Sequence, residues 1–274
     1  MEFLMEENAN FKKNLIFTVT AGRTGTTYLA KLLAAVEDIT AYHEPEPNFV
    51  SCMRAVQHNP ILAYKFWKEM KLPKIFASQT LFYSETSHLC CKGFIEPLIN
   101  IGIKAPYLIA LRRPPREIAI SYLERNTVPG RTSLGLMYCR MPSDPMALPF
   151  PGWELATNYQ LCYWMALDME VMVDRYKALY RNSTWEIFDC TSQELKHSEV
   201  FFSLLHYLGL SGKINSGLEA THATISEISH NPNPSKLRFN EQALAKQENR
   251  VWERVKNYFP FLRESLCDRF KREV

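Results

Sequence analysis

The chain has 274 residues, 46% of them apolar, and its 32 basic and 29 acidic side chains give a formal net charge of +3. This even balance argues against a nucleic-acid-binding surface, on which basic residues dominate one face, and no apolar run approaches the ~18 residues of a membrane span. The acidic N-terminus also lacks the regions of a signal peptide. We therefore expect one cytoplasmic domain over residues 1–274, with neither nucleic acid nor membrane as partner; composition does not specify its oligomeric state.

The seven cysteines are odd in number and lack the spacing of metal ligands. Cys90 and Cys91 are adjacent, which is poor geometry both for a mutual disulfide and for two ligands of one metal. We therefore expect reduced thiols and no metal site.

The first informative segment is predicted to fold as a strand, a tight loop and a helix. Asn14–Thr20 is a β-branched and aromatic run, whereas Tyr28–Val36 is an apolar stretch rich in alanine and leucine. In the loop, Gly22 and Gly25 let the backbone approach a ligand, and the first N–H groups of a helix attract an anion. Arg23 adds a positive charge, and three hydroxyls add donors: Thr24, Thr26 and Thr27.

This loop is not a Walker A motif, because two residues rather than four separate its glycines and Thr26 stands where that motif has lysine. Its Arg-x-Gly-Thr-Thr arrangement resembles the 5′-phosphosulfate loop of sulfotransferases, which move a sulfuryl group from 3′-phosphoadenosine 5′-phosphosulfate (PAPS) to an acceptor. The resemblance implies a single-domain α/β fold with a mostly parallel central sheet flanked by helices and a P-loop-like turn. It also implies that the donor is bound by Arg23, Thr24, Gly25, Thr26 and Thr27, and that Arg23 acts catalytically by neutralising charge on the sulfuryl oxygens.

The next motif is His43-Glu44-Pro45-Glu46-Pro47. Its prolines exclude a helix and are expected to hold Glu44 in an extended segment. In a doubly wound sheet the second strand ends beside the first, which would place Glu44 near the phosphate loop. In sulfotransferase families similar to this chain, including tyrosylprotein sulfotransferases, a glutamate at this distance acts as general base. The resemblance therefore implies that role for Glu44, with His43 as the alternative base.

Tyr83–His88 leads into Leu89–Phe94, which is predicted to be a strand. A histidine at a strand boundary is often simply hydrogen-bonded in the core. Many sulfotransferases, however, have a substrate-side histidine or serine in this region. His88 is therefore a candidate catalytic residue, with the structural role as the alternative.

A second phosphate-binding element is predicted in Ala105–Arg125. Its first part, Pro106–Leu111, is a buried-strand pattern, and a helix follows the two prolines after Arg113. An arginine at a strand end with a serine eight residues later, here Ser121, resembles the 3′-phosphate-binding element of sulfotransferases. This chain departs from that pattern in having Pro114 where an acidic residue is usual. A strand ending in two arginines also argues against a magnesium-dependent NTPase, whose Walker B strand ends in aspartate.

Residues 126–152 are rich in proline and methionine, and we predict a long loop that acts as a lid over the acceptor.

Four further elements are predicted in the rest of the chain. They are a helix over Trp153–Tyr180, a strand over Ser183–Asp189, a helix over Val200–Leu208 and a helix over Glu241–Asn257 that is capped by Asn240. Phe188-Asp189 resembles weakly the Tyr-Glu-Asp strand end that touches adenine in sulfotransferases. Thr221–Arg238 is predicted to be a turn-rich loop. Because related enzymes close a basic C-terminal loop over the 3′-phosphate, Lys236 is the candidate there and Arg238 the alternative.

These motifs together favour a PAPS-dependent sulfotransferase. The resemblance implies in-line transfer to a hydroxyl or nitrogen of a small-molecule acceptor, with Glu44 as base, adenosine 3′,5′-bisphosphate as product and no metal. It extends to bacterial enzymes of secondary metabolism, including those that sulfate cyanobacterial guanidinium alkaloids. Two alternatives stay open: a P-loop kinase-like phosphotransferase, against which the missing Walker residues count, and a non-catalytic nucleotide-binding protein, which would need anion contacts but no base.

Overall fold

The structure is a computed structural model that describes residues 13–181, 186–228 and 239–271. Five strands form one parallel sheet in the order β2-β3-β1-β4-β5. Their bounds are β1 Asn14–Val19, β2 Ile39–Tyr42, β3 Phe82–Glu85, β4 Tyr107–Arg112 and β5 Ile187–Thr191. The predicted α/β class with a parallel central sheet is confirmed.

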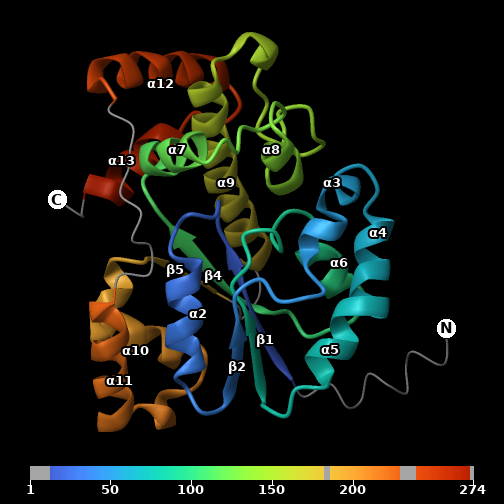
Figure 1. Cartoon of the computed structure of the whole chain (residues 1–274), viewed down its shortest axis with the longest axis vertical. Coiled ribbons are helices and arrows are strands. Elements are labelled where there is room, and N and C mark those ends of the chain that lie inside the picture. Colours follow the sequence, from blue (N-terminus) through green and yellow to red (C-terminus); the bar gives the residue numbers. More distant parts are fainter. Residues whose placement is uncertain (1–12, 182–185, 229–238, 272–274) are drawn as a thin grey trace.

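Helices cover both faces of this sheet (Figure 1). One face carries α2 (Thr26–Ala34), α10 (Ser198–Tyr207) and α11 (Ser216–Glu227). The other face carries α3 (Met53–Val56), α4 (Ile61–Lys65), a π-helical turn (Phe66–Lys71), α5 (Leu72–Phe76), α6 (Ile95–Asn100) and α9 (Asn158–Tyr180). Beyond the sheet lie α7 (Pro115–Glu124), α8 (Ser133–Tyr138), α12 (Glu241–Val255) and α13 (Leu262–Lys271).

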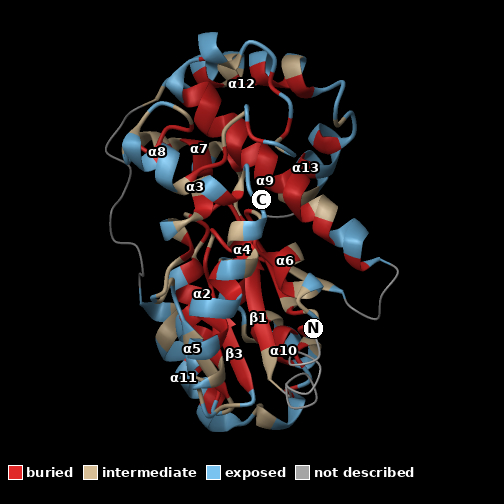
Figure 2. Cartoon of the chain, turned by 90° about the vertical axis from the view of Figure 1, so that its right-hand side faces the viewer, coloured by how far each residue is buried: buried red, intermediate tan, exposed pale blue. Residues whose placement is uncertain are grey.

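The two faces bury separate cores, and this explains the continuous apolar runs of the central strands. Leu15, Phe17 and Val19 of β1 point into the core beneath α9, whereas Ile16 points into the core beneath α2. Successive side chains of a strand face opposite sides, so a strand covered on both faces must be apolar at nearly every position. Figure 2 shows β1 and much of α9 as buried.

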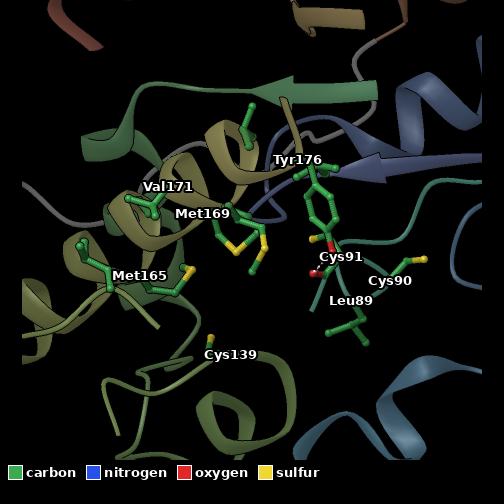
Figure 3. Close-up of a cluster of buried hydrophobic side chains, with 14 of the residues drawn as sticks. Leu89, Cys90, Cys91, Cys139, Met165, Met169, Val171 and Tyr176 are labelled. Carbon is green, nitrogen blue, oxygen red and sulfur yellow. Dashed lines mark hydrogen bonds between the residues drawn. The ribbon is translucent and has the colours of Figure 1, made fainter. Parts of the chain in front are cut away.

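Several predicted elements need correction. β2 does not lie beside β1, because β3 is inserted between them. The predicted strand Leu89–Phe94 is wrong, since this stretch forms turns and the strand is Phe82–Glu85. Its apolar character comes from burial against α9: Tyr176 Oη donates a hydrogen bond to the carbonyl oxygen of Cys91 at 3.2 Å (Figure 3).

The other corrections concern element boundaries. Of the predicted strand Ser183–Asp189, the described part is a strand from Ile187, and this strand continues to Thr191; α11 continues to Glu227 where a loop was expected. The long helix begins at Asn158 rather than Trp153, because Thr157 and Gln160 form a capping box there. Asn240 caps α12 as predicted, but a further helix, α13, follows it.

Two further features bear on the classes of protein considered above. In the described ranges, no helix combines the length and apolar character needed to cross a membrane. No group of three or more His, Cys, Asp or Glu side chains among those same residues is placed to hold a metal ion. Cys90 and Cys91 are both buried free thiols.

Candidate active site

The loop between β1 and α2 leaves the start of that helix open to an anion. Gly22, Arg23 and Gly25 have φ angles of 86°, 61° and 101°, so the chain turns through left-handed backbone that favours glycine. Gly25 is the N-cap of α2 and makes no side-chain cap, and the first turn carries no acidic residue. The helix N-terminus therefore presents unsatisfied N–H groups and partial positive charge to the loop.

Hydrogen bonds to neighbouring elements fix the shape of this loop. Thr20 Oγ1 donates to the carbonyl oxygen of Leu111 at 2.8 Å and lies 2.6 Å from Thr24 Oγ1. From α7, Tyr122 Oη donates to the carbonyl oxygen of Ala21. The hydroxyl of the buried Thr24 thus takes part in the loop's own network. Its predicted contact with the donor stays a prediction, as do those of the buried Thr26 and the exposed Thr27.

Ser192, which sequence analysis did not single out, packs against this loop. It follows β5 directly, and a Cβ added to Gly25 would lie 2.6 Å from Ser192 Cβ. The carboxyl ends of parallel strands meet at one edge of a sheet, so the strand prediction could have brought Ser192 to the site. That signal was lost because the predicted strand ended two residues early.

Alanine at Gly25 should therefore destabilise the fold for two reasons, the left-handed φ and the collision with Ser192. Gly209 is a matched control, because its φ is 75° but an added Cβ would meet nothing within 4 Å. We expect Gly209→Ala to lower the free energy of unfolding by ~1–2 kcal/mol and Gly25→Ala to lower it further. Urea unfolding of both variants tests this, and equal losses would contradict the close packing at Gly25.

An arginine cluster joins the loop to α7. Arg23 Nε donates to Ser121 Oγ at 3.2 Å, and Arg113 Nη1 donates to the carbonyl oxygen of Arg23 at 2.8 Å. Burial, followed by the charge of Arg125 and then by that of Arg113, lowers the pKa of Arg23. Glu117 is the carboxylate paired with Arg113, at 2.8 Å. The two elements that were predicted to hold separate phosphates therefore meet at Arg23, in a locally positive environment suited to an anion.

Arg125 was not predicted as a site residue. It is the C-cap of α7, four residues after Ser121 and hence on the same helical face. A helical i, i+4 relation to the predicted phosphate ligand was the signal in the sequence that could have found it.

Glu44 and His88 form a hydrogen-bonded pair next to the loop. His88 Nδ1 lies 2.6 Å from Glu44 Oε1, and their side chains are 14% and 22% exposed. The imidazole also lies against the loop between β1 and α2, since a Cβ on Gly22 would approach His88 Cγ to 3.0 Å. The structure thus brings Glu44 and His88 to the loop that carries Arg23, the third residue predicted to be catalytic. His43 instead places Nδ1 2.9 Å from the carbonyl oxygen of Thr86.

The charges of this pair follow from its surroundings. Burial opposes ionisation of Glu44, but the hydrogen bond from His88 and the charges of His88 and His43 outweigh it and lower the pKa of Glu44 to about 2. Burial and the charge of Lys92 lower the pKa of His88 below 6.5, despite the opposing effect of Glu44. At neutral pH, Glu44 is therefore a carboxylate that accepts a hydrogen bond from a neutral imidazole.

Glu44 does not have the extended conformation expected before proline. Its φ is 50°, in the left-handed region, which costs a non-glycine residue on the order of 1 kcal/mol or more. Asn48 Nδ2 donates to the carbonyl oxygen of Glu44 at 3.1 Å and helps to hold this turn. The preference for extended backbone before proline is thus overridden in this turn, and the Glu44 carboxylate lies against His88.

Part of the segment 126–152 reaches the same pair. It contains α8, whose last residue, Tyr138, has its ring 5.9 Å from the ring of His88. Lys92 Nζ donates to the carbonyl oxygen of Tyr138 at 2.5 Å, and Leu148 N donates to Asp168 Oδ1 at 2.7 Å. The segment is therefore fixed to the body of the protein at several points, and its role as a lid over the acceptor stays a prediction.

Two further donor contacts were predicted, one in the C-terminal loop and one at the end of β5. Lys236 and Arg238 lie outside the described residues. Asp189, which was compared with the adenine-contacting strand end, accepts two hydrogen bonds of 2.8 Å from the buried Arg112 and one of 2.6 Å from Lys177. Its half-buried carboxylate is therefore already paired with two cations.

A parallel sheet with a glycine-containing turn between its first strand and helix, flanked by Arg113 just after β4, defines a P-loop-like architecture. Among solved structures, the chain matches the "Sulfotransferase Domain from the Curacin Biosynthetic Pathway" with a TM-score of 0.52 and 13% identity, over 94% of this chain and 98% of that one. The chain therefore has a sulfotransferase fold. No family model and no curated protein matches its sequence.

Proposed function

We propose that the protein is a sulfotransferase that moves a sulfuryl group from PAPS to a hydroxyl or nitrogen of a small-molecule acceptor. The observation that carries this proposal is the placement of the Glu44–His88 pair against the loop that carries Arg23 and leads into the uncapped N-terminus of α2. An anion site alone would serve any phosphate ligand, whereas an acid–base pair beside it serves group transfer.

The positive groups of the site fit the charges of the donor. Arg23 and the N–H groups of α2 would hold the phosphosulfate, and Arg113 with Ser121 would hold the 3′-phosphate. PAPS, when bound, supplies the sulfuryl group and leaves as adenosine 3′,5′-bisphosphate. The side chain of Arg23 would neutralise charge that develops on the transferring group.

Proton removal from the acceptor is assigned to His88, with Glu44 orienting it. A general base works best when its pKa lies near the working pH, whereas the hydrogen bond from His88 Nδ1 occupies Glu44 Oε1 and lowers the pKa of this carboxyl below its ordinary value. The imidazole of His88 is neutral at neutral pH. No described residue hydrogen-bonds its Nε2 atom, which can therefore take the proton. Glu44 then fixes the tautomer through Nδ1 and stabilises the imidazolium that forms.

The two other functions are less well supported. A kinase-like phosphotransferase would need an acidic residue at the end of β4 for magnesium, where this chain has Arg112 paired with Asp189. A nucleotide-binding protein without activity would have no need of the Glu44–His88 pair. The acceptor class suggested by the resemblance, a small secondary metabolite such as a guanidinium alkaloid, stays an expectation.

Ligand choice tests the proposed donor. Adenosine 3′,5′-bisphosphate binds only the native state and should raise the free energy of unfolding by ~2.7 kcal/mol at a hundredfold excess over its dissociation constant. ATP with magnesium should give a much smaller increase, because it lacks the 3′-phosphate. Thermal unfolding with each ligand is the measurement, and Arg113→Ala is expected to remove most of the difference. Equal stabilisation of the wild type by both ligands would contradict the proposal.

A further inference from the structure

Lys71 is a fully buried cation directly beneath the turn that carries Glu44. Its side chain is 1% exposed, and Nζ lies 2.6 Å from Glu85 Oε2. Nζ also donates to the carbonyl oxygens of Pro45 at 3.2 Å and Pro47 at 2.8 Å. The three donors of the ammonium group are thus matched by three oxygens, two of which belong to the backbone that follows Glu44.

The helical turn that contains Lys71 buries this charged side chain and exposes its apolar neighbour, the reverse of the usual preference of the two residue types. In the π-helical turn Phe66–Lys71, Met70 is 48% exposed whereas Lys71 is buried. Burying a charged group is costly unless it is paired, and exposing the methionine forgoes apolar burial. π-helical turns are frequent at functional sites, where they redirect a side chain. A chain selected for core stability alone would have the apolar residue inside.

The partner of Lys71 belongs to the same corner of the sheet. Glu85 is the last residue of β3 and pairs in register with Tyr42, the last residue of β2. Glu44 lies two residues beyond the end of β2, and His88 three residues beyond the end of β3. Lys71 therefore connects the end of one strand with the loop after the other, at the point where the two catalytic residues meet.

We propose that Lys71 is a positioning residue: through its bonds to the carbonyl oxygens of Pro45 and Pro47 it fixes the left-handed turn at Glu44 and so places the Glu44 carboxylate on His88. The positioning of Glu44 by Lys71 is argued from hydrogen-bond geometry alone, whereas its importance for catalysis rests on the proposed function. Asn48 holds the same turn through the carbonyl oxygen of Glu44, and Lys71 holds it through the carbonyl oxygens of Pro45 and Pro47.

The test follows the proton shared by Glu44 and His88, so it needs no acceptor. The measurement is an NMR spectrum of protein with ¹⁵N-labelled histidine. A strongly deshielded proton signal reports an imidazole N–H that is hydrogen-bonded to a carboxylate, and its absence from the His88→Gln variant assigns it to His88. In the double variant Lys71→Met with Glu85→Gln, the amide can still accept a hydrogen bond from Tyr83 and no buried charge is left unpaired. We expect this variant to fold, to bind adenosine 3′,5′-bisphosphate normally and to lose the signal.

Two matched controls isolate the lysine. Glu85→Gln alone keeps the contacts of Lys71 with Pro45 and Pro47, and Lys68→Met changes an exposed lysine of the same turn. Both should retain the signal.

A double variant that folds and keeps the signal overturns the proposal, as does loss of the signal in Lys68→Met. Should the double variant not fold, Lys71→Arg keeps the charge beside Glu85, but its planar fork cannot occupy the single Nζ position that serves both prolyl carbonyls. The signal should then weaken, and an unchanged signal would contradict the assignment. A protein that shows these effects but transfers no sulfuryl group would refute the proposed function and leave the role of Lys71 intact.

Discussion

Replacing His88 by glutamine is expected to lower turnover by ~10²–10⁴-fold, the usual contribution of a general base, and to leave affinity for adenosine 3′,5′-bisphosphate nearly unchanged. The amide can still hydrogen-bond Glu44 but cannot take a proton. Glu44→Gln should lower turnover over a similar range, because an amide can hold the imidazole in the wrong tautomer. Steady-state kinetics with an active acceptor, combined with calorimetric titration of the bisphosphate, separates these effects.

The double variant and the pH profile show how the pair works. Two residues that act as a unit are not additive, so Glu44→Gln combined with His88→Gln should be little worse than either change alone. His43→Ala is the control and should have a small effect. Because the pKa of His88 lies below 6.5, the neutral base persists into mildly acidic solution, and turnover should fall only at lower pH. Normal turnover of His88→Gln would return proton removal to Glu44 or His43.

Arg23→Ala should reduce donor affinity and turnover together, which sets it apart from changes to the pair. Its guanidinium lies between the loop and Ser121, where it would meet the donor in the ground state and developing charge in the transition state. Hydrogen bonds to charged groups contribute ~1.5–3 kcal/mol, and loss of one transition-state donor lowers turnover by ~10²–10³-fold. Bisphosphate titration and steady-state kinetics measure both effects.

An exposed arginine on α12 provides the matched control for this change. Arg250→Ala should alter neither bisphosphate affinity nor turnover. If Arg23→Ala binds the bisphosphate with wild-type affinity, the anion site lies elsewhere.

The sequence predicted those parts of the site that depend on local pattern. A β-branched strand, a glycine turn and an apolar helix follow from residue preferences over a few positions, and the structure has them at Asn14–Val19 and Thr26–Ala34. The spacing of Arg113 and Ser121 predicted that the two side chains lie close together, and both contact Arg23; their shared phosphate stays a prediction. Their meeting at Arg23 was not predictable, because it depends on how α7 packs against the loop.

The predictions that failed depend on tertiary contacts. The apolar run Leu89–Phe94 has the composition of a buried strand, but burial by α9 produces the same pattern in a turn. The left-handed backbone of Glu44 contradicts the preference of a residue before proline. It is supported by hydrogen bonds from Lys71, which is distant in the sequence, and from the polar side chain of Asn48, and no sequence pattern indicates either bond. No periodicity in the sequence indicates that Lys71 rather than Met70 faces inward.

Direct transfer tests the central claim. Purified protein would be incubated with PAPS and a panel of hydroxyl, amine, guanidine and carbamoyl acceptors, and the products identified by mass spectrometry, with adenosine 5′-phosphosulfate as the matched donor that lacks the 3′-phosphate. The account predicts a sulfated acceptor and one equivalent of adenosine 3′,5′-bisphosphate from PAPS, both strongly reduced in His88→Gln, and much less product from the control donor. Phosphoryl transfer from ATP with magnesium, and no sulfated product from PAPS with any acceptor, would contradict it.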